Sequence, residues 1–401
     1  MIKGEILLKG DKSVTHRVLM ISSLFEYNVK IYNPSDCLDI VSTINVLNKC
    51  GAVIYYVKNN LICSGTASRN PESILNCGNS GTTARLLTGL LFGMGISARI
   101  DGDKSLRSRP MDRLLKPLEL MNLKYHSKGK KLPLDIYSST PKQIKYKLDV
   151  PSAQVKSAIL LAGFKNNISE VVDSYGTRDH TERMINYFQN CTFTKPYLKY
   201  KVSGDISSAA FLIASAVCIP NSDILIKNVL YNKTRFGFIE TLIEMNADIV
   251  ISNINDEYNE GICDIRVKYS QSIMPSKNHM SRIVSMIDEI PIFAVVSCFV
   301  NGITSVTNSK ELRIKESDRI SSLCSHFSSA GVMIKELSDG FIINPDKKLY
   351  NTIKINSQDH RIIMACEVFN LIIGSGLSSK YENEVSISFP DFYNILKELQ
   401  K

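Results

Sequence analysis

The amino-acid sequence predicts an α/β protein, and three observations lead to this class. Short β-type runs, such as residues 52–57 and 224–226, alternate with helix-type runs rich in Ala and Leu, such as 82–91 and 207–217. This alternation continues to the C-terminus, which favours strand–helix units over an all-helical or all-strand chain. The composition, 44% hydrophobic and 22% charged, is typical of globular domains and excludes disorder, collagen-like repeats and coiled coil.

The chain length indicates more than one domain. At roughly 150 residues a domain, 401 residues predict two large domains or three ordinary ones. Pro and Gly are spread along the chain and no segment resembles a linker. The tetrapeptide Gly-Asp-x-Ser occurs at 10–13, 102–105 and 204–207, which is a faint indication of repeated units.

Membrane and zinc-binding classes find no support in the sequence. The longest nearly apolar stretches (86–96, 209–220 and 290–300) fall well short of the ~20 residues that cross a bilayer. Residues 1–5 lack the apolar core of a secretion signal, so we expect a cytoplasmic protein without a membrane partner. The ten cysteines include no Cys-x-x-Cys pair, so we expect buried thiols and no metal site.

The net charge of +9 is open to several interpretations. Clustered Lys and Arg would suit nucleic acid, a pocket for a small polyanion, or only a solvated surface. Segment 93–98 matches the dinucleotide fingerprint G-x-G-x-x-A, but it follows a helix and precedes a strand, the reverse of the required order. Segment 4–13 resembles a phosphate loop but has an extra residue and an inserted acid. We therefore expect no nucleotide cofactor.

Two segments near the N-terminus combine helix starts with cations or glycines. Segment 10–17, Gly-Asp-Lys-Ser-Val-Thr-His-Arg, places Lys12, Ser13 and Arg17 at a predicted helix start, where free amides favour an anion. Segment 76–85 places Gly81 among small hydroxyl residues, so that a ligand can approach the backbone. A capped helix with surface cations and an ordinary glycine turn explain the same patterns equally well.

Three further segments add polar groups. Segment 101–111 predicts a stiff basic loop that contains Arg109 and stops at a proline, although a solvated charge run is the usual explanation. Segment 149–157 opens a helix after Pro151 and presents a hydroxyl and an amide, and segment 177–182 supplies another cation, Arg178.

The densest cluster lies in the C-terminal third of the chain. Asp288 borders an apolar segment, and Lys315 and Arg319 are four residues apart, which on a helix would place them on one face. Glu316 beside them is either held ionised or carries a proton. Arg361 stands at the start of an apolar helix.

Taken together, these segments resemble the enolpyruvyl transferase family over nearly the whole chain. The most specific pieces are Gly-Asp-Lys-Ser-x-x-x-Arg at 10–17, Asn-Ser-Gly-Thr-Thr at 79–83, Arg-Pro-Met at 109–111 and Leu-Arg-Ile-Lys-Glu-Ser-Asp-Arg at 312–319. Ser-Ala-Gln at 152–154 and Thr-Arg-Asp-His-Thr-Glu at 177–182 are similar to the bacterial branch called class II.

The resemblance implies a two-domain fold in which each domain contains three βαβαββ units with helices inside, an inside-out α/β barrel. On this basis we expect one domain over 11–202 and a second made of 1–10 and 203–401, with the active-site cleft between them. The echo of Gly-Asp-x-Ser agrees with repetition without proving it.

The resemblance also implies a reaction. The enolpyruvyl group of phosphoenolpyruvate would pass to the 5-hydroxyl of shikimate 3-phosphate and release phosphate. By the family pattern, shikimate 3-phosphate would be bound by Lys12, Ser13, Arg17, Ser152, Ala153, Gln154, Arg178, Asp288 and Lys315. Phosphoenolpyruvate would be bound by Lys12, Gly81, Arg109, Gln154, Arg319 and Arg361. The catalytic residues would be Lys12, Asp288 as base for the hydroxyl, and Glu316 as proton donor to the methylene carbon.

With cationic side chains for two dianionic substrates, no metal or other cofactor is expected. One departure stands out: many family members carry Lys just before the final Ser/Thr-Phe-Pro, whereas this chain has Ile387, so that contact is missing or moved to Lys380.

Three alternatives remain open at this point. A UDP-N-acetylglucosamine enolpyruvyl transferase would carry Cys in the loop before Arg-Pro, and residues 104–109 contain none. A nucleic-acid-binding module would interleave aromatic residues with the cations, and the chain has no Trp. A non-catalytic anion-binding homologue would be expected to lose Asp288 or Glu316. We expect a monomer acting on small molecules, with no nucleic acid.

Overall fold

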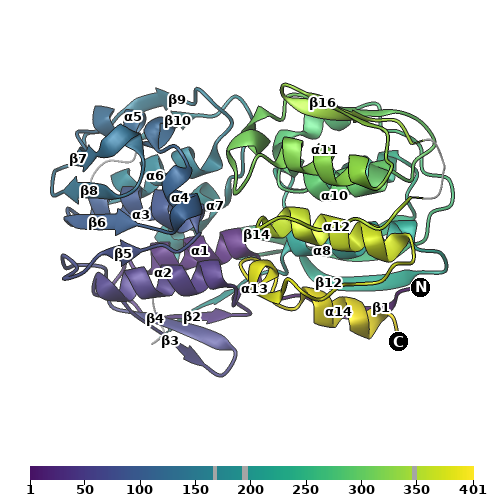
Figure 1. Ribbon diagram of the computed structural model, residues 1–401. Helices are drawn as coiled ribbons and strands as arrows, with labels where there is room; N and C mark the ends of the chain where they lie inside the picture. Colours follow the sequence, from purple (N-terminus) through teal and green to yellow (C-terminus); the bar gives the residue numbers. More distant parts are fainter. Residues whose placement is uncertain (166–168, 192–196, 346–349) are drawn as a thin grey trace. The chain divides into compact units, whose positions relative to one another are not determined.

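The computed structural model describes residues 1–165, 169–191, 197–345 and 350–401, and the chain divides into two compact units (Figure 1). The N-terminal unit comprises Lys9–Ser203 together with Asp256–Glu260. The C-terminal unit comprises Met1–Leu8, Gly204–Asn255 and Gly261–Lys401. The chain therefore changes unit at 8/9 and 203/204, and the short segment 256–260 joins the N-terminal unit.

The N-terminal unit contains two four-stranded sheets of the same design. The first has the order β11-β2-β4-β3, and the second has the order β5-β6-β8-β7. In both, the first two strands are parallel and the second is antiparallel to the third. A third, two-stranded sheet pairs β10 with β9 in parallel. The strands are β2 (Val29–Tyr32), β3 (Val53–Val57), β4 (Asn60–Ser64), β5 (Leu75–Asn76), β6 (Ala98–Asp101), β7 (Lys124–Ser127), β8 (Leu134–Tyr137), β9 (Lys145–Lys147), β10 (Glu170–Val172) and β11 (Leu198–Lys201).

Three almost entirely buried helices, α1 (Lys12–Ser22), α3 (Gly81–Gly93) and α6 (Ala153–Gly163), form the core of this unit. Helices α3 and α6 pack most closely because α3 presents glycines to the α6 backbone. A Cβ at Gly89 would lie 2.2 Å from the Ala158 carbonyl oxygen, and one at Gly93 would lie 2.7 Å from that of Ala162. The inner helices are therefore held in tight mutual contact.

The remaining helices of the unit are more amphipathic or short. They are α2 (Leu38–Lys49), α4 (Lys104–Ser108), α5 (Asp112–Leu120) and α7 (His180–Asn190), with the 3₁₀ turn η1 (Lys128–Lys130). The segment 101–111, expected to be a basic loop, contains α4 instead. Asp103 caps this helix by accepting from the Leu106 amide at 2.7 Å, and Asp101 pairs with Arg107, so two acids compensate the basic run.

The C-terminal unit contains one four-stranded sheet of the same design and one smaller sheet. Its four-stranded sheet has the order β1-β12-β14-β13, again with a parallel first pair and an antiparallel second pair. A three-stranded antiparallel sheet has the order β15-β17-β16. The strands are β1 (Lys3–Leu7), β12 (Asp223–Tyr231), β13 (Ile249–Glu257), β14 (Glu260–Lys268), β15 (Thr304–Val306), β16 (Ile334–Leu337) and β17 (Gly340–Ile343).

Three inner helices again form the core: α8 (Ile206–Cys218), α10 (Ile290–Ser297) and α12 (His360–Ile372) pack on one another (Figure 1). The other helices are α9 (Gly237–Glu244), α11 (Arg319–Ser329), α13 (Glu382–Val385) and α14 (Phe392–Leu399), with 3₁₀ turns η2 (His279–Arg282), η3 (Val284–Met286) and η4 (Lys310–Ile314). Helices α8 and α10 are buried on every side, which explains why their sequences are apolar without a polar stripe.

The structure confirms the α/β class and the repetition. The predicted strands 52–57 and 224–226 correspond to β3 and part of β12, and the predicted buried helices 82–91 and 207–217 to α3 and α8. Two of the three Gly-Asp-x-Ser copies start the equivalent inner helices α1 and α8, whereas the third starts the short α4. No helix among the described residues is long and apolar enough to cross a membrane.

Candidate active site

The start of α1 gathers the first set of predicted residues. Asp11 caps the helix by accepting from the Val14 amide at 2.9 Å, as predicted for a helix that begins near Ser13. Lys12 Nζ lies 2.8 Å from Asp39 Oδ2, so this cation is held near the helix N-terminus by a carboxylate from α2. The amide end of α1 and the Lys12 ammonium together favour an anion.

Arg17 lies one turn further along α1 and is buried, 3% exposed. Its Nε donates to Thr181 Oγ1 at 2.8 Å and its Nη2 to Ser157 Oγ at 2.9 Å. The predicted Arg178 joins the same cluster, because its Nη1 donates to Ser13 Oγ at 3.4 Å. The three segments 10–17, 152–157 and 177–182, which the sequence could only name separately, therefore meet at one place.

The start of α3 forms a second group, in which Gly81 lies against two arginines. Ser80 caps this helix through the Thr83 amide. A Cβ at Gly81 would lie 2.7 Å from Arg85 Nη1 and 3.2 Å from Arg109 Nη1, so glycine is required for these guanidinium groups to approach the backbone. Arg109 is 5% exposed.

The start of α6 connects to this group through Gln154. Ser152 caps the helix, and Ala153 is its first residue, as expected from Pro151. Gln154 Oε1 accepts from Arg85 Nη1 at 2.9 Å, and its amide nitrogen donates to Thr82 Oγ1 at 3.0 Å. Hydrogen bonds thus tie the N-termini of α3 and α6 together, while Arg17 ties α1 to α6. This end of the N-terminal unit is a cationic, donor-rich region suited to anionic substrates.

The C-terminal unit holds a second charged cluster around Asp288. Lys315 Nζ and Arg319 Nη1 each lie 3.5 Å from Asp288 Oδ1. Arg361 Nη1 donates to the Asp288 carbonyl at 2.9 Å. Glu316 Oε2 lies 2.5 Å from Arg319 Nη2. All five predicted residues of this unit are therefore in one place.

The geometry corrects one prediction about this cluster. Lys315 and Arg319 do not share a helix face, because η4 ends at Ile314 and α11 begins only at Arg319, with Asp318 as its cap. Their side chains meet through Asp288 instead of through helical spacing. Residue Asp318 accepts from the Ser321 amide, and this cap starts the helix later than the sequence pattern predicts.

Arg319 is the most deeply buried cation, at 1% exposure. Burial alone would lower its pKa, but the attraction of Asp359 and Glu316 outweighs burial and raises it. The pKa of Asp359 moves the other way: burial would raise it, yet Arg319 holds it below its usual value. Both groups therefore stay charged, and Arg319 is available to an anion at any ordinary pH.

Comparison with known proteins identifies the family. The family model for EPSP synthase (3-phosphoshikimate 1-carboxyvinyltransferase) matches residues 1–396. This chain belongs to the EPSP synthase family. A relative from Endomicrobium trichonymphae with the name 3-phosphoshikimate 1-carboxyvinyltransferase is 40% identical over 421 residues, covering 99% of this chain and 97% of the relative. One of the same name from Aquifex aeolicus is 35% identical and covers 100% and 98%.

Solved structures place the fold in the same family. An EPSP synthase from Acinetobacter baumannii superposes with a TM-score of 0.80 at 32% identity, covering 99% of this chain and 96% of that one. The enolpyruvyl transferase NikO from Streptomyces tendae gives a TM-score of 0.72 at 13% identity, covering 100% and 95%, and supports the fold alone. The predicted two-domain enolpyruvyl transferase fold is confirmed.

Several residues that contact the predicted site residues of this EPSP synthase family member were not predicted from the sequence. Arg85 bridges Gly81 to Gln154, Asp39 holds Lys12, and Asp359 holds Arg319. Arg85 lies within segment 76–85, which the sequence had singled out, and Asp359 lies two positions before the predicted Arg361, so adjacency to a motif was the available signal. Asp39 lies 27 positions from Lys12 on α2 and had no such signal. At the departure from the family, Lys380 is exposed and Ile387 follows α13.

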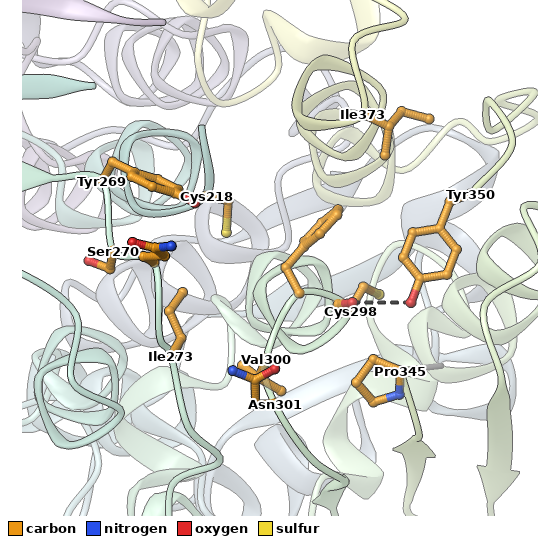
Figure 2. A pocket seen from close by; sticks show the side chains of 12 residues that line it. Cys218, Tyr269, Ser270, Ile273, Cys298, Val300, Asn301, Pro345, Tyr350 and Ile373 are labelled. Atoms are coloured by element: carbon orange, nitrogen blue, oxygen red, sulfur yellow. Dashed lines mark hydrogen bonds between the residues drawn. The ribbon is translucent and has the colours of Figure 1, made fainter. Parts of the chain in front are cut away.

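One cavity lies away from all of these residues (Figure 2). It has a volume of about 420 Å³ and is lined at Cys218, Cys298 and Ile373, where the inner helices α8, α10 and α12 end. None of its lining residues carries a charge. Asp288 and Arg361 lie near the opposite, N-terminal ends of α10 and α12, and the helix C-termini at this cavity do not favour dianionic substrates. Within the described parts of the chain, no three His, Cys, Asp or Glu side chains cluster as a metal site.

Proposed function

We propose that this protein transfers the enolpyruvyl group of phosphoenolpyruvate to the 5-hydroxyl of shikimate 3-phosphate, as a 3-phosphoshikimate 1-carboxyvinyltransferase. One observation carries the proposal: every cation assigned from the family pattern lies in one of two clusters, at the N-termini of the inner helices in each unit. Each substrate brings a phosphate and a carboxylate, and forked guanidinium groups match both.

Shikimate 3-phosphate is assigned mainly to the cluster of the N-terminal unit. Ser13, Arg17 and Arg178 offer a hydroxyl and two guanidinium groups at the start of α1, and Ser152 to Gln154 offer the amide end of α6. Lys12, Asp288 and Lys315 complete the set. The proposed site therefore takes residues from both expected domains. These are 11–202 for the first domain, and 1–10 together with 203–401 for the second.

Phosphoenolpyruvate is assigned to three arginines, of which Arg319 and Arg361 already contact carboxylates. Arg109, Arg319 and Arg361, with Lys12, Gly81 and Gln154, form this set. In the C-terminal unit, Arg319 and Arg361 contact Asp288, Glu316 and Glu289, so carboxylate recognition is already present in the protein's own contacts. A substrate carboxylate or phosphate would engage the remaining donors of the same groups.

Asp288 is proposed as the base. Lys315 and Arg319 stabilise its negative charge, and an ionised carboxylate can accept the proton of the attacking hydroxyl. Glu316 is proposed to protonate the methylene carbon of phosphoenolpyruvate. It pairs with Arg319 in the free protein, and a dianionic substrate beside it would favour its protonated form.

The steps balance as addition followed by elimination. The substrate hydroxyl loses its proton to Asp288 as its oxygen bonds to the central carbon of phosphoenolpyruvate, while Glu316 gives a proton to the methylene carbon. The tetrahedral adduct then breaks its carbon–oxygen bond to phosphate and loses one methyl proton to the Glu316 carboxylate, which re-forms the double bond, and the departing phosphate takes up the proton held by Asp288. Lys12 and the arginines would stabilise the charge that develops on the leaving phosphate.

The deciding experiment measures phosphate release from phosphoenolpyruvate with two acceptors. We expect release with shikimate 3-phosphate and none with UDP-N-acetylglucosamine; the reverse result would identify the alternative transferase. No release with either would refute the proposal and favour a non-catalytic anion-binding protein. Because all proposed cations are side chains, a chelator should leave the rate unchanged, and sedimentation should report a monomer.

Glu316→Gln tests the proton-donor role. We expect kcat to fall by roughly 100-fold or more, the usual contribution of a positioned acid or base. Glu336→Gln is the matched control, because Glu336 also pairs with an arginine, Arg313 at 2.9 Å, but away from Asp288. Turnover of Glu316→Gln near that of the wild type would show that the proton comes from another group.

A further inference from the structure

The two equivalent inner helices α1 and α8 begin in the same way. Asp11 and Asp205 each cap their helix by accepting from the amide three residues on, at 2.9 and 2.8 Å. Two residues after each cap stands a serine, and an arginine donates to its hydroxyl. At α1, Arg178 donates to Ser13 at 3.4 Å, and at α8, Arg235 donates to Ser207 at 3.1 Å. The C-terminal unit therefore contains a second copy of the anion-binding arrangement.

The second copy already contains an anion of the protein itself. Ser207 Oγ donates a hydrogen bond to Glu289 Oε1, so the Glu289 carboxylate lies at the serine–arginine end of α8. Glu289 is 1% exposed, and its other oxygen, Oε2, is buried with no hydrogen-bond partner in the described part of the chain. A buried carboxylate oxygen without a hydrogen bond is costly unless nearby cations compensate its charge.

Arg361 supplies such a cation and is also a proposed phosphoenolpyruvate ligand. Its Nη1 lies 3.9 Å from Glu289 Oε1 and donates to the carbonyl of Asp288 at 2.9 Å. Glu289 also caps α10, so its backbone fixes the end of the segment that carries the proposed base. The carboxylate thus lies between the α8 anion site on one side and Arg361 on the other.

We propose that Glu289 is a positioning residue for the phosphoenolpyruvate-binding half of the active site. Its carboxylate occupies the α8 copy of the anion site and, from there, orients the Arg361 guanidinium. The inference rests on the proposed function. It assigns Glu289 no proton transfer and no substrate contact.

The test compares Glu289→Ala and Glu289→Gln with the wild type in the phosphate-release assay. Both variants lose one of the two carboxylates near Arg361, the other being Asp288, whose Oδ2 lies 3.9 Å from Nη2. We therefore expect the KM for phosphoenolpyruvate to rise roughly tenfold, with the KM for shikimate 3-phosphate nearly unchanged. Glu289→Gln keeps the volume of the side chain, so it preserves the readout if the alanine variant folds poorly.

Rescue by a small carboxylate separates positioning from a merely structural role. Glu289→Ala leaves Ser207, Arg235 and Arg361 around an emptied anion site, so added formate should lower its KM for phosphoenolpyruvate towards the wild-type value. Glu289→Gln still fills the site and should not respond. Sodium chloride at matched ionic strength controls for screening.

Glu367→Ala is the matched control. Glu367 is also a fully buried carboxylate of the C-terminal unit, on the same helix as Arg361, and it accepts from Tyr393 Oη at 3.0 Å and from the Ser378 amide at 2.8 Å. We expect this variant to lose thermal stability without a selective rise in KM and without rescue by formate.

The outcomes separate the two proposals. A wild-type protein that releases no phosphate refutes the proposed function. An active wild type with an unchanged KM for phosphoenolpyruvate in both Glu289 variants refutes the positioning role. A raised KM that formate does not reverse, or that formate reverses equally in Glu367→Ala, also overturns it.

Discussion

Asp359→Asn tests how far the buried ion pair supports the C-terminal unit. Asp359 contacts Arg319 twice, at 2.8 Å to Nε and 3.2 Å to Nη2, and both side chains are almost completely buried. Asp359 also caps α12 by accepting from the Arg361 amide at 3.0 Å. Asparagine has the same size and is an equally good cap, so the substitution removes the charge and replaces one of the two oxygens, each of which accepts from Arg319, by an NH2 donor.

The expected cost follows from the charges that remain. Removing one partner of a buried ion pair costs about 3–5 kcal/mol, because the other charge is left uncompensated. Here Arg319 still has Glu316 at 2.5 Å and Asp288 at 3.5 Å, so we expect the lower end of that range. For a folding unit of roughly 200 residues, about 3 kcal/mol corresponds to a Tm about 6–12 °C lower.

The pH dependence has a definite sign. Because the pKa of Asp359 is lowered in the folded protein, its stabilisation is complete above its unfolded value of about 3.9 and is lost as the pH falls through the folded value. The difference in Tm between the wild type and Asp359→Asn should therefore be full at neutral pH and shrink in acid.

Calorimetry of both proteins at neutral pH measures the difference in Tm. Asp318→Asn is the matched control: it caps the neighbouring helix α11 and pairs with Arg313, but its side chain is 40% exposed, so we expect a cost of at most about 1 kcal/mol. A loss of Tm no larger than that of the control would refute the claim that this buried charge pair organises the cluster.

Three further predictions test other parts of the molecule. Gly81→Ala places a methyl carbon 2.7 Å from Arg85 Nη1 and should raise the KM for phosphoenolpyruvate roughly tenfold with a smaller effect on kcat; unchanged kinetics would contradict this. Glu260→Gln weakens the buried contact to His180 Nδ1 at 2.6 Å, and this contact fixes the start of α7. The affinity for shikimate 3-phosphate, measured by calorimetry, should therefore fall roughly threefold to tenfold. A wild-type affinity would contradict this prediction. The hydrogen bond from Arg282 lowers the pKa of Glu244 to about 2. Urea unfolding of Glu244→Gln should therefore show a free energy of unfolding about 1 kcal/mol lower at pH 7, and this difference should vanish as the pH falls from about 4.5 towards 2. A difference that does not change with pH would contradict the prediction.

The elements that the sequence predicted well are those with local causes. The start of α1 follows from Asp11 and its bond to an amide three residues on, and that of α6 follows from Ser152. The inner helices follow from long apolar runs without a polar face. The prediction was wrong in two places where a capping aspartate sets the start of a helix. Helix α11 starts only at Arg319, after Asp318, and α4 forms after Asp103 in a segment expected to be a loop.

The candidate site depended on contacts between distant residues. Arg17 meets Ser157 and Thr181, which are 140 and 164 positions away, and no periodicity relates these positions. The family resemblance named side chains that meet in the structure, but it did not name Arg85, which donates to Gln154, or Glu289, which lies 3.9 Å from Arg361.

The sequence by itself determined where α1 and α6 begin, which helices are buried, and which segments offer helix-end amides and cations, because caps, propensities and free helix-end amides depend on neighbours within about one turn. Only the tertiary structure decided which of these segments meet. Long-range packing brought Ser13 to Arg178, placed three cations around Asp288, and brought Glu289 to Ser207 at the start of α8. Such contacts form only when the sheets and inner helices pack, and local sequence carries no record of them.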